Sequence, residues 1–113
     1  MAITNLSYLR KITDGNKVII DEMIELFLSQ VPVFIHNFHK YYQAGQYEAL
    51  GKEAHKAKSS LQIMGMTDLE QEMKTFMLHA AKGTNVENYL LHIKSFEMQC
   101  EKAVAELKAD MER

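Results

Sequence analysis

The chain has 113 residues, of which 47% are hydrophobic and 25% charged, and its formal net charge is −2. These values predict one globular domain over residues 1–113 and disfavour disorder, and so small a charge gives no field to attract nucleic acid or an acidic membrane. The single cysteine cannot form an internal disulfide, the first residues lack a signal-peptide core, and no apolar run approaches the roughly 20 residues of a membrane span. We therefore expect a cytoplasmic protein.

One proline and five glycines leave few turn signals, which favours long helices over a sheet. The segment Asn5–Ile12 is expected to be a short helix that covers one end of the fold with Leu6, Leu9 and Ile12. After it, four longer stretches place apolar residues at alternating spacings of three and four, as on one face of an α-helix. They run from about Asn16 to Gly45, from Tyr47 to Gly65, from Thr67 or Asp68 (as N-cap) to Gly83, and from Thr84 or Asn85 to Met111.

The first long stretch contains Pro32, which removes one backbone donor. We expect it to kink that helix without ending it, because the apolar pattern continues in phase through Tyr41. Each apolar face needs partners, and short connections make successive helices antiparallel. The pattern therefore predicts an all-α fold, an antiparallel up-down-up-down four-helix bundle with a short extra N-terminal helix, as a monomer.

The second long helix carries small and polar residues on the side away from its apolar stripe. With about 100° per residue, they form a strip centred on His55: Gly51, Lys52, His55, Lys58, Ser59 and Gln62. Glycine inside a helix costs on the order of 1 kcal/mol relative to alanine. Gly51 therefore also suggests the close approach of another backbone.

An accessible imidazole among lysines can serve as a nucleophile, and the lysines would stabilise an anion that forms on it. Phosphoryl transfer needs this combination of a positioned attacking atom and nearby cations. The alternative is an ordinary surface histidine among solubilising lysines. Composition and spacing alone favour the ordinary surface histidine, because isolated surface histidines are common.

The run from Ala54 to Gly65 reads AHKAKSSLQIMG. It resembles the motif A-H-x-[LAI]-K-G-x-x-x-x-[LIVM]-G of the histidine-containing phosphotransfer (HPt) family, with His55 on the family's phosphoacceptor and Ser59 where the family usually has glycine. Upstream, residues 8–12 and 14–16 look like the family's short first helix and its turn, and residues 25–28 resemble its second helix. The resemblance covers nearly the whole chain.

The resemblance implies a carrier without kinase activity of its own. His55 would accept a phosphoryl group from the aspartyl phosphate of a receiver domain and pass it to another receiver. Lys58 would pair with the phosphoryl oxygens, Gln62 would hydrogen-bond the same group or orient the imidazole, and Gly65 would have a structural role. The implied partners are response-regulator receiver domains and hybrid sensor histidine kinases. No cofactor is expected on this chain, whose sequence lacks nucleotide-binding glycine motifs, and Mg²⁺ would come with the receiver.

A partner that docks over His55 would contact its neighbours Gly51, Lys52 and Ser59, and docking surfaces usually include an apolar patch. The first long helix offers Leu28, which could form such a patch with Val31 if that flank lies beside the His55 helix. The alternative is that these residues widen the buried face of their helix.

A histidine pair and the single cysteine are the other candidates for chemistry. His36 and His39 lie three residues apart, but no carboxylate pair accompanies them, so we expect no metal site. Cys100 falls on an apolar stripe and is expected to be a small buried residue.

The alternative function is a non-catalytic helical adaptor that binds receivers or other proteins without accepting phosphate.

Overall fold

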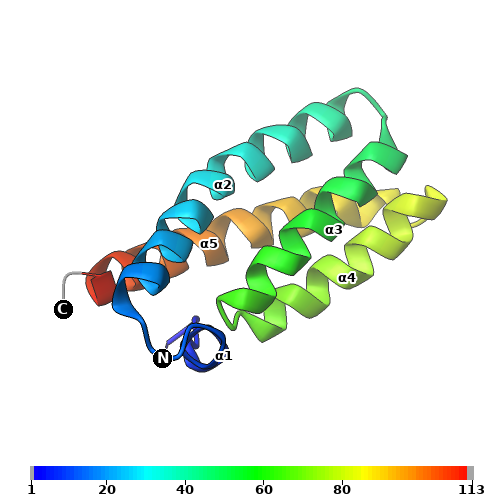
Figure 1. Cartoon of the computed structure of the whole chain (residues 1–113). Coiled ribbons are helices and arrows are strands. Elements are labelled where there is room, and N and C mark those ends of the chain that lie inside the picture. The colour runs from blue at the N-terminus through cyan, green and yellow to red at the C-terminus, as the bar shows by residue number, and fades with distance from the viewer. Residues whose placement is uncertain (1, 112–113) are drawn as a thin grey trace.

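The computed structural model describes residues 2–111, and over these residues all regular structure is helical. The direction of the chain alternates from one long helix to the next, as the colours of Figure 1 show. The elements are α1 (Ser7–Ile12), α2 (Lys17–Gln43), α3 (Tyr47–Ile63), α4 (Thr67–Lys82), a single 3₁₀ turn (Val86–Asn88) and α5 (Tyr89–Met111).

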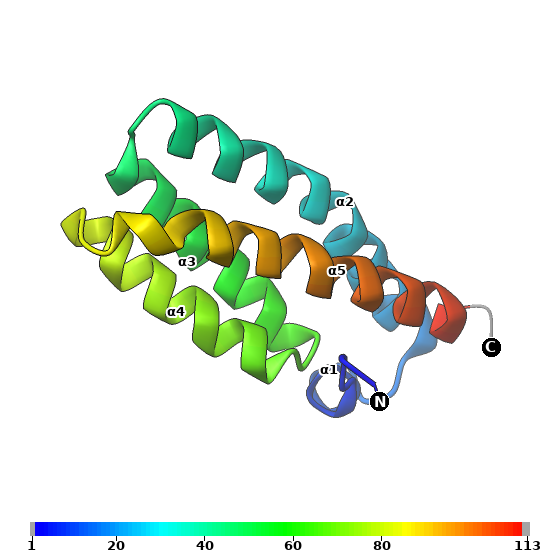
Figure 2. The same ribbon diagram turned by 180° about the vertical axis from the view of Figure 1, so that it is seen from behind.

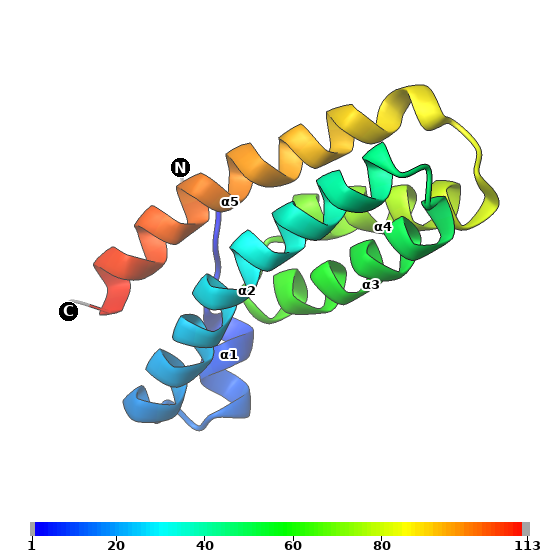
Figure 3. The ribbon, with the colours of Figure 1, turned by 90° about the horizontal axis from the view of Figure 1, so that it is seen from above.

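The four long helices pack as a closed ring, in which α2 and α4 each contact both α3 and α5. Figures 1 and 3 both show α3 and α4 side by side, and Figure 2 shows α5 between α2 and α4. The apolar stripes predicted from the sequence are buried, or half-buried at their ends. At the centre, the Phe38 ring lies 5.8 Å from the Phe76 ring and 5.1 Å from the Phe96 ring, between centroids. The predicted helical periodicity is thus confirmed by the burial.

Local signals explain some of the helix ends. The Asn16 side chain accepts a hydrogen bond from the Ile19 N–H at 3.3 Å, and α4 ends at Gly83 in the left-handed conformation (φ +66°). The prediction that Thr67 or Asp68 caps α4 was wrong, because Met66 holds that position without a side-chain cap bond. Met66 is 1% exposed, and its side chain belongs to the core.

Two expectations about α1 and α2 had different outcomes. Helix α2 runs without interruption through Pro32. Leu6 and Leu9 are buried at the end of the fold, but Ile12 is 49% exposed, so its predicted covering role was wrong. Ile12 is the last residue of a six-residue helix, after which the chain turns at once towards α2.

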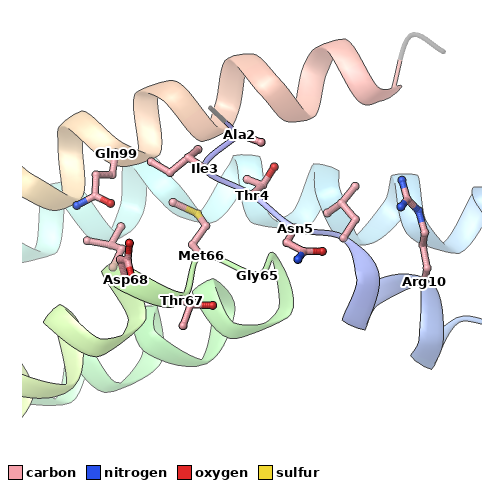
Figure 4. Close-up of a pocket in the computed structure, with 12 residues that line it drawn as sticks. Ala2, Ile3, Thr4, Asn5, Arg10, Gly65, Met66, Thr67, Asp68 and Gln99 are labelled. Carbon is pink, nitrogen blue, oxygen red and sulfur yellow. The ribbon is translucent and has the colours of Figure 1, made fainter.

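An N-terminal arm, residues 2–6, connects α5 to the turn between α3 and α4 (Figure 4). The Glu106 carboxylate accepts hydrogen bonds from the Ile3 N–H (2.8 Å to Oε2), the Thr4 N–H (3.1 Å) and the Thr4 hydroxyl (2.9 Å). Burial raises the pKa of the Glu106 carboxyl, these hydrogen bonds lower it, and the pKa lies below its ordinary value of 4.5 overall. Further along the arm, the Asn5 N–H donates to the Met64 carbonyl at 3.0 Å.

Candidate functional site

Helix α3 divides into a buried face and an outward face. Leu50, Ala54, Ala57 and Leu61 are fully buried against the neighbouring helices. On the opposite side the side chains are exposed, and we call Lys52, His55, Ser59 and Gln62 the outward face of α3. The exposure of these four residues agrees with the sequence analysis.

His55 lies in the middle of this face and is exposed. Its backbone carbonyl accepts a 3.4 Å hydrogen bond from the Ser59 hydroxyl, a bond within the helix that leaves the ring untouched. Among residues 2–111, no side chain makes a hydrogen bond or ion pair with the His55 imidazole. The ring nitrogens are therefore accessible to a group that arrives from solvent.

The three lysines near His55 differ in their partners. Lys52 lies 3.8 Å from a carboxylate oxygen of Glu48, and Lys56 lies 3.8 Å from one of Glu53. Lys58 is half-buried and has no carboxylate within ion-pair distance among the described residues. Lys58, one helical turn after His55, therefore provides a positive charge that is not already neutralised.

Gly51 does not belong to the exposed strip, and its prediction as a docking residue was wrong. It is buried where α3 meets α4, and a β-carbon there would lie 3.2 Å from both the Met77 carbonyl oxygen and the Ala81 nitrogen. The other interpretation of this glycine, the close approach of a second backbone, is the one observed. The effect of Gly51 on the site is indirect: the missing side chain lets the α4 backbone pack closely against α3 one turn before His55.

Gly65 has the structural role expected of it. Its φ is +68°, which favours glycine, and a β-carbon would lie 2.1 Å from the carbonyl oxygen of Asn5 in the arm. A pocket of about 560 Å³ lies beside this crossing, between the arm and the start of α4 (Figure 4). No residue of the outward face of α3 lines that pocket.

The predicted apolar docking patch on α2 was wrong in its residues. Val31 is 6% exposed and belongs to the core, and Leu28 is half-buried against it. Helix α2 faces α3 through Gln30 and Asn37, whereas Leu28 lies on the flank of His39, which pairs with Glu97 of α5. The patch therefore faces α5 and not the His55 helix, in line with the alternative that it widens the buried face.

A different apolar surface lies beside α3, and the sequence analysis missed it. A narrow groove of about 90 Å³ follows the contact of α2 and α3, and Leu26, exposed by 58%, stands at its edge. Ile19 and Val33 continue this flank of α2 at a spacing of seven and are 41% and 54% exposed. This second apolar row, outside the core stripe, is the sequence feature from which the exposed apolar flank could have been predicted. The groove is lined by Met23, Leu26, Phe27, Gln30, Ser60, Ile63 and Met64.

Other chemistry finds little support in residues 2–111. No group of three or more His, Cys, Asp or Glu side chains there could hold a metal ion. Cys100 is buried, and burial raises the pKa of its thiol to about 12, so it is a poor nucleophile at neutral pH. No helix among the same residues has the length and apolar character that crossing a membrane requires.

Comparison with protein-family models, with curated proteins and with solved structures gave no match to this chain.

Proposed function

We propose that this chain is a histidine phosphotransfer protein, in which α2–α5 form an up-down-up-down four-helix bundle and α1 covers one end. His55 accepts a phosphoryl group from the aspartyl phosphate of a receiver domain. The observation that carries the proposal is the exposed imidazole of His55, which lies one turn from Lys58; within residues 2–111 the ring has no side-chain partner and Lys58 has no ion-pair partner. The resemblance of residues 54–65 to the HPt motif adds the kind of reaction, phosphoryl transfer between a receiver's aspartate and a histidine.

The transfer is a displacement at phosphorus. One unprotonated ring nitrogen of His55 attacks the phosphorus atom, and the N–P bond forms as the P–O bond to the receiver's aspartate breaks. The aspartate leaves as a carboxylate with the electron pair of that bond. The imidazole proton remains on the other ring nitrogen, from which it exchanges with water. The reverse displacement passes the group to the aspartate of a second receiver.

The chain's own residues position and stabilise the transferred group. The Lys58 ammonium would balance charge on the phosphoryl oxygens in the transition state, since phosphoryl transfer depends on positioning and cations. Gln62, one turn beyond Lys58 on the exposed side, would donate a hydrogen bond to the same oxygens. The receiver would bring the acidic residues and Mg²⁺, and the chain would need no nucleotide site.

Docking would use the exposed surface around His55. The polar centre is the outward face of α3, and the groove edged by Leu26 supplies an apolar region beside it. Receiver domains, free or within hybrid sensor kinases, are the partners that we propose, with this chain as a monomer and no nucleic acid involved.

The experiment is incubation of the full chain with a receiver domain carrying labelled aspartyl phosphate. The expected result is label on the chain that is lost in acid and kept in alkali, as for a phosphohistidine. The variant His55→Gln should take up no label while keeping its helical circular-dichroism spectrum. The matched control is His36→Gln, which changes an exposed histidine on α2 and should label normally.

Two outcomes would contradict the proposal. Label that persists in His55→Gln places the phosphoryl group elsewhere. A folded chain that binds receivers but takes no label from any of several of them indicates the adaptor function instead.

A further inference from the structure

Two side-chain hydrogen bonds connect α2 and α3 on either side of His55. The Asn37 amide donates to Glu53 Oε2 at 2.8 Å, and the Ser60 hydroxyl donates to Gln30 Oε1 at 3.0 Å. On each helix the two bonded residues lie seven positions apart, which is about two helical turns. The bonds are thus repeated along one antiparallel contact, and the segment of α3 between them contains His55.

The apolar contacts of this segment do little to fix its rotation. The buried face of α3 has Ala54 and Ala57 at its centre, and Gly51 contacts α4 one turn earlier. Such small residues allow helices to lie close together, but they offer no large side chains to interlock with the neighbouring helix. Between the two bonds, a rotation of α3 about its axis therefore displaces only small apolar side chains, because the large buried ones, Leu50 and Leu61, lie beyond the ends of this segment.

The polar contacts, in contrast, are directional. Glu53 is 4% exposed and is the one buried charged residue in the described part of the chain. Rotation or sliding of α3 would separate its carboxylate from Asn37 and leave a buried charge without a hydrogen bond, which is costly. Buried polar pairs can select one register of packed helices for this reason, although they add little net stability.

We propose that Asn37, Glu53, Gln30 and Ser60 are positioning residues, which hold α3 at the rotation that presents His55 and Lys58 together to a docked receiver. This inference rests on the proposed function. None of the four residues touches the transferred group, and their effect reaches it through the orientation of α3. Loss of the Asn37–Glu53 bond, whose residues do not line the docking groove, should therefore slow transfer without changing how tightly the receiver binds.

The test is the double variant Asn37→Leu/Glu53→Leu, which replaces the buried pair by apolar side chains of similar size and can retain the fold. With a phosphorylated receiver as donor, we expect the maximal transfer rate to fall about tenfold while the KM for the receiver is unchanged, since misplacement by an ångström can cost that much or more. If this variant does not fold, the test is the maximal transfer rate of Ser60→Ala at saturating receiver, because this variant removes only the second bond but Ser60 also lines the docking groove. The expected loss is about threefold.

Two matched variants separate positioning from other effects. Glu53→Gln removes the charge beside Lys56 but keeps an acceptor for Asn37, so it should transfer at nearly the normal rate. Ser95→Ala removes a 2.7 Å hydrogen bond to Glu72 between α4 and α5, away from α3, and should also transfer normally. A normal rate in the folded double variant, a raised KM alone, or an equal loss in Glu53→Gln would overturn the inference.

A small donor distinguishes failure of this inference from failure of the proposed function. Phosphoramidate phosphorylates an accessible imidazole directly, with cleavage of its P–N bond and loss of ammonia, and needs no docked partner. The double variant should react with it at His55 as fast as the unchanged protein. If the unchanged protein takes label neither from phosphoramidate nor from receivers, the proposed function itself is wrong.

Discussion

Polar side chains serve different purposes on α3 and α5. Along α5 they are tied to neighbouring elements: His92 Nδ1 lies 2.8 Å from Glu72 of α4, Glu97 pairs with His39 of α2, and Glu106 holds the arm. The outward face of α3 has no such interhelical bonds among the described residues. A polar, exposed helix face whose side chains make no bonds to other helices can bind a partner without losing contacts that stabilise the fold. His39 and His92 therefore have carboxylate partners, whereas the His55 ring has none among residues 2–111 and is accessible to an incoming group.

The largest effect on stability is expected from Glu106→Ala. This change leaves the N–H groups of Ile3 and Thr4 without their acceptor in a partly buried place, which should cost about 2 kcal/mol in the free energy of unfolding. Urea unfolding followed by circular dichroism measures it. The control Glu101→Ala changes an exposed acid on the same helix and should stay within about 0.5 kcal/mol of the unchanged protein. Equal losses in both variants would mean that the arm is not held by Glu106.

A smaller effect of Glu106 should appear in the pH dependence of the free energy of unfolding. Because the folded pKa of Glu106 is lowered, its charged form stabilises the fold above the ordinary value of 4.5, and this stabilisation is lost as the pH falls through 4.5 towards the lowered pKa. The unfolding free energies of the unchanged protein and of Glu106→Gln should therefore converge over the interval in which the pH falls from above 4.5 to below it. A difference that stays constant over that interval would contradict this account of the arm.

The smallest effects come from a direct comparison of two histidines. His92 stacks on Phe76 with 5.1 Å between ring centroids and bonds to Glu72, so His92→Ala should cost about 1–2 kcal/mol in thermal unfolding experiments. His55→Ala should change the stability by less than about 0.5 kcal/mol, because the exposed ring has no hydrogen-bond or ion-pair partner in the part of the chain that the structure describes. If His55→Ala costs as much as His92→Ala, the outward face of α3 is structural after all.

Much of the fold was predictable because the apolar periodicity is regular. The four long helices lie within one or two residues of their expected bounds at most ends, since Asn16, Gly45, Gly65 and Gly83 give local stop and start signals. The start of the last helix was predicted wrongly: α5 begins at Tyr89, after the 3₁₀ turn Val86–Asn88, and not near Thr84 or Asn85.

The candidate site was predictable in part. Helical spacing correctly placed Lys52, His55, Ser59 and Gln62 on an exposed face. It could not say which neighbour covers each flank, and for this reason Gly51 and the Leu28–Val31 patch were assigned wrongly to a docking surface.

The sequence by itself determined the helices, the core stripes and the exposed histidine, because these follow from the period of a single helix. Only the tertiary structure decided the rest. It buried Glu53 beside Asn37, brought Gly51 against α4, and set the groove edged by Leu26 next to α3. These features join residues far apart in the chain, and their contacts depend on the rotation of one helix against another, which no local spacing records.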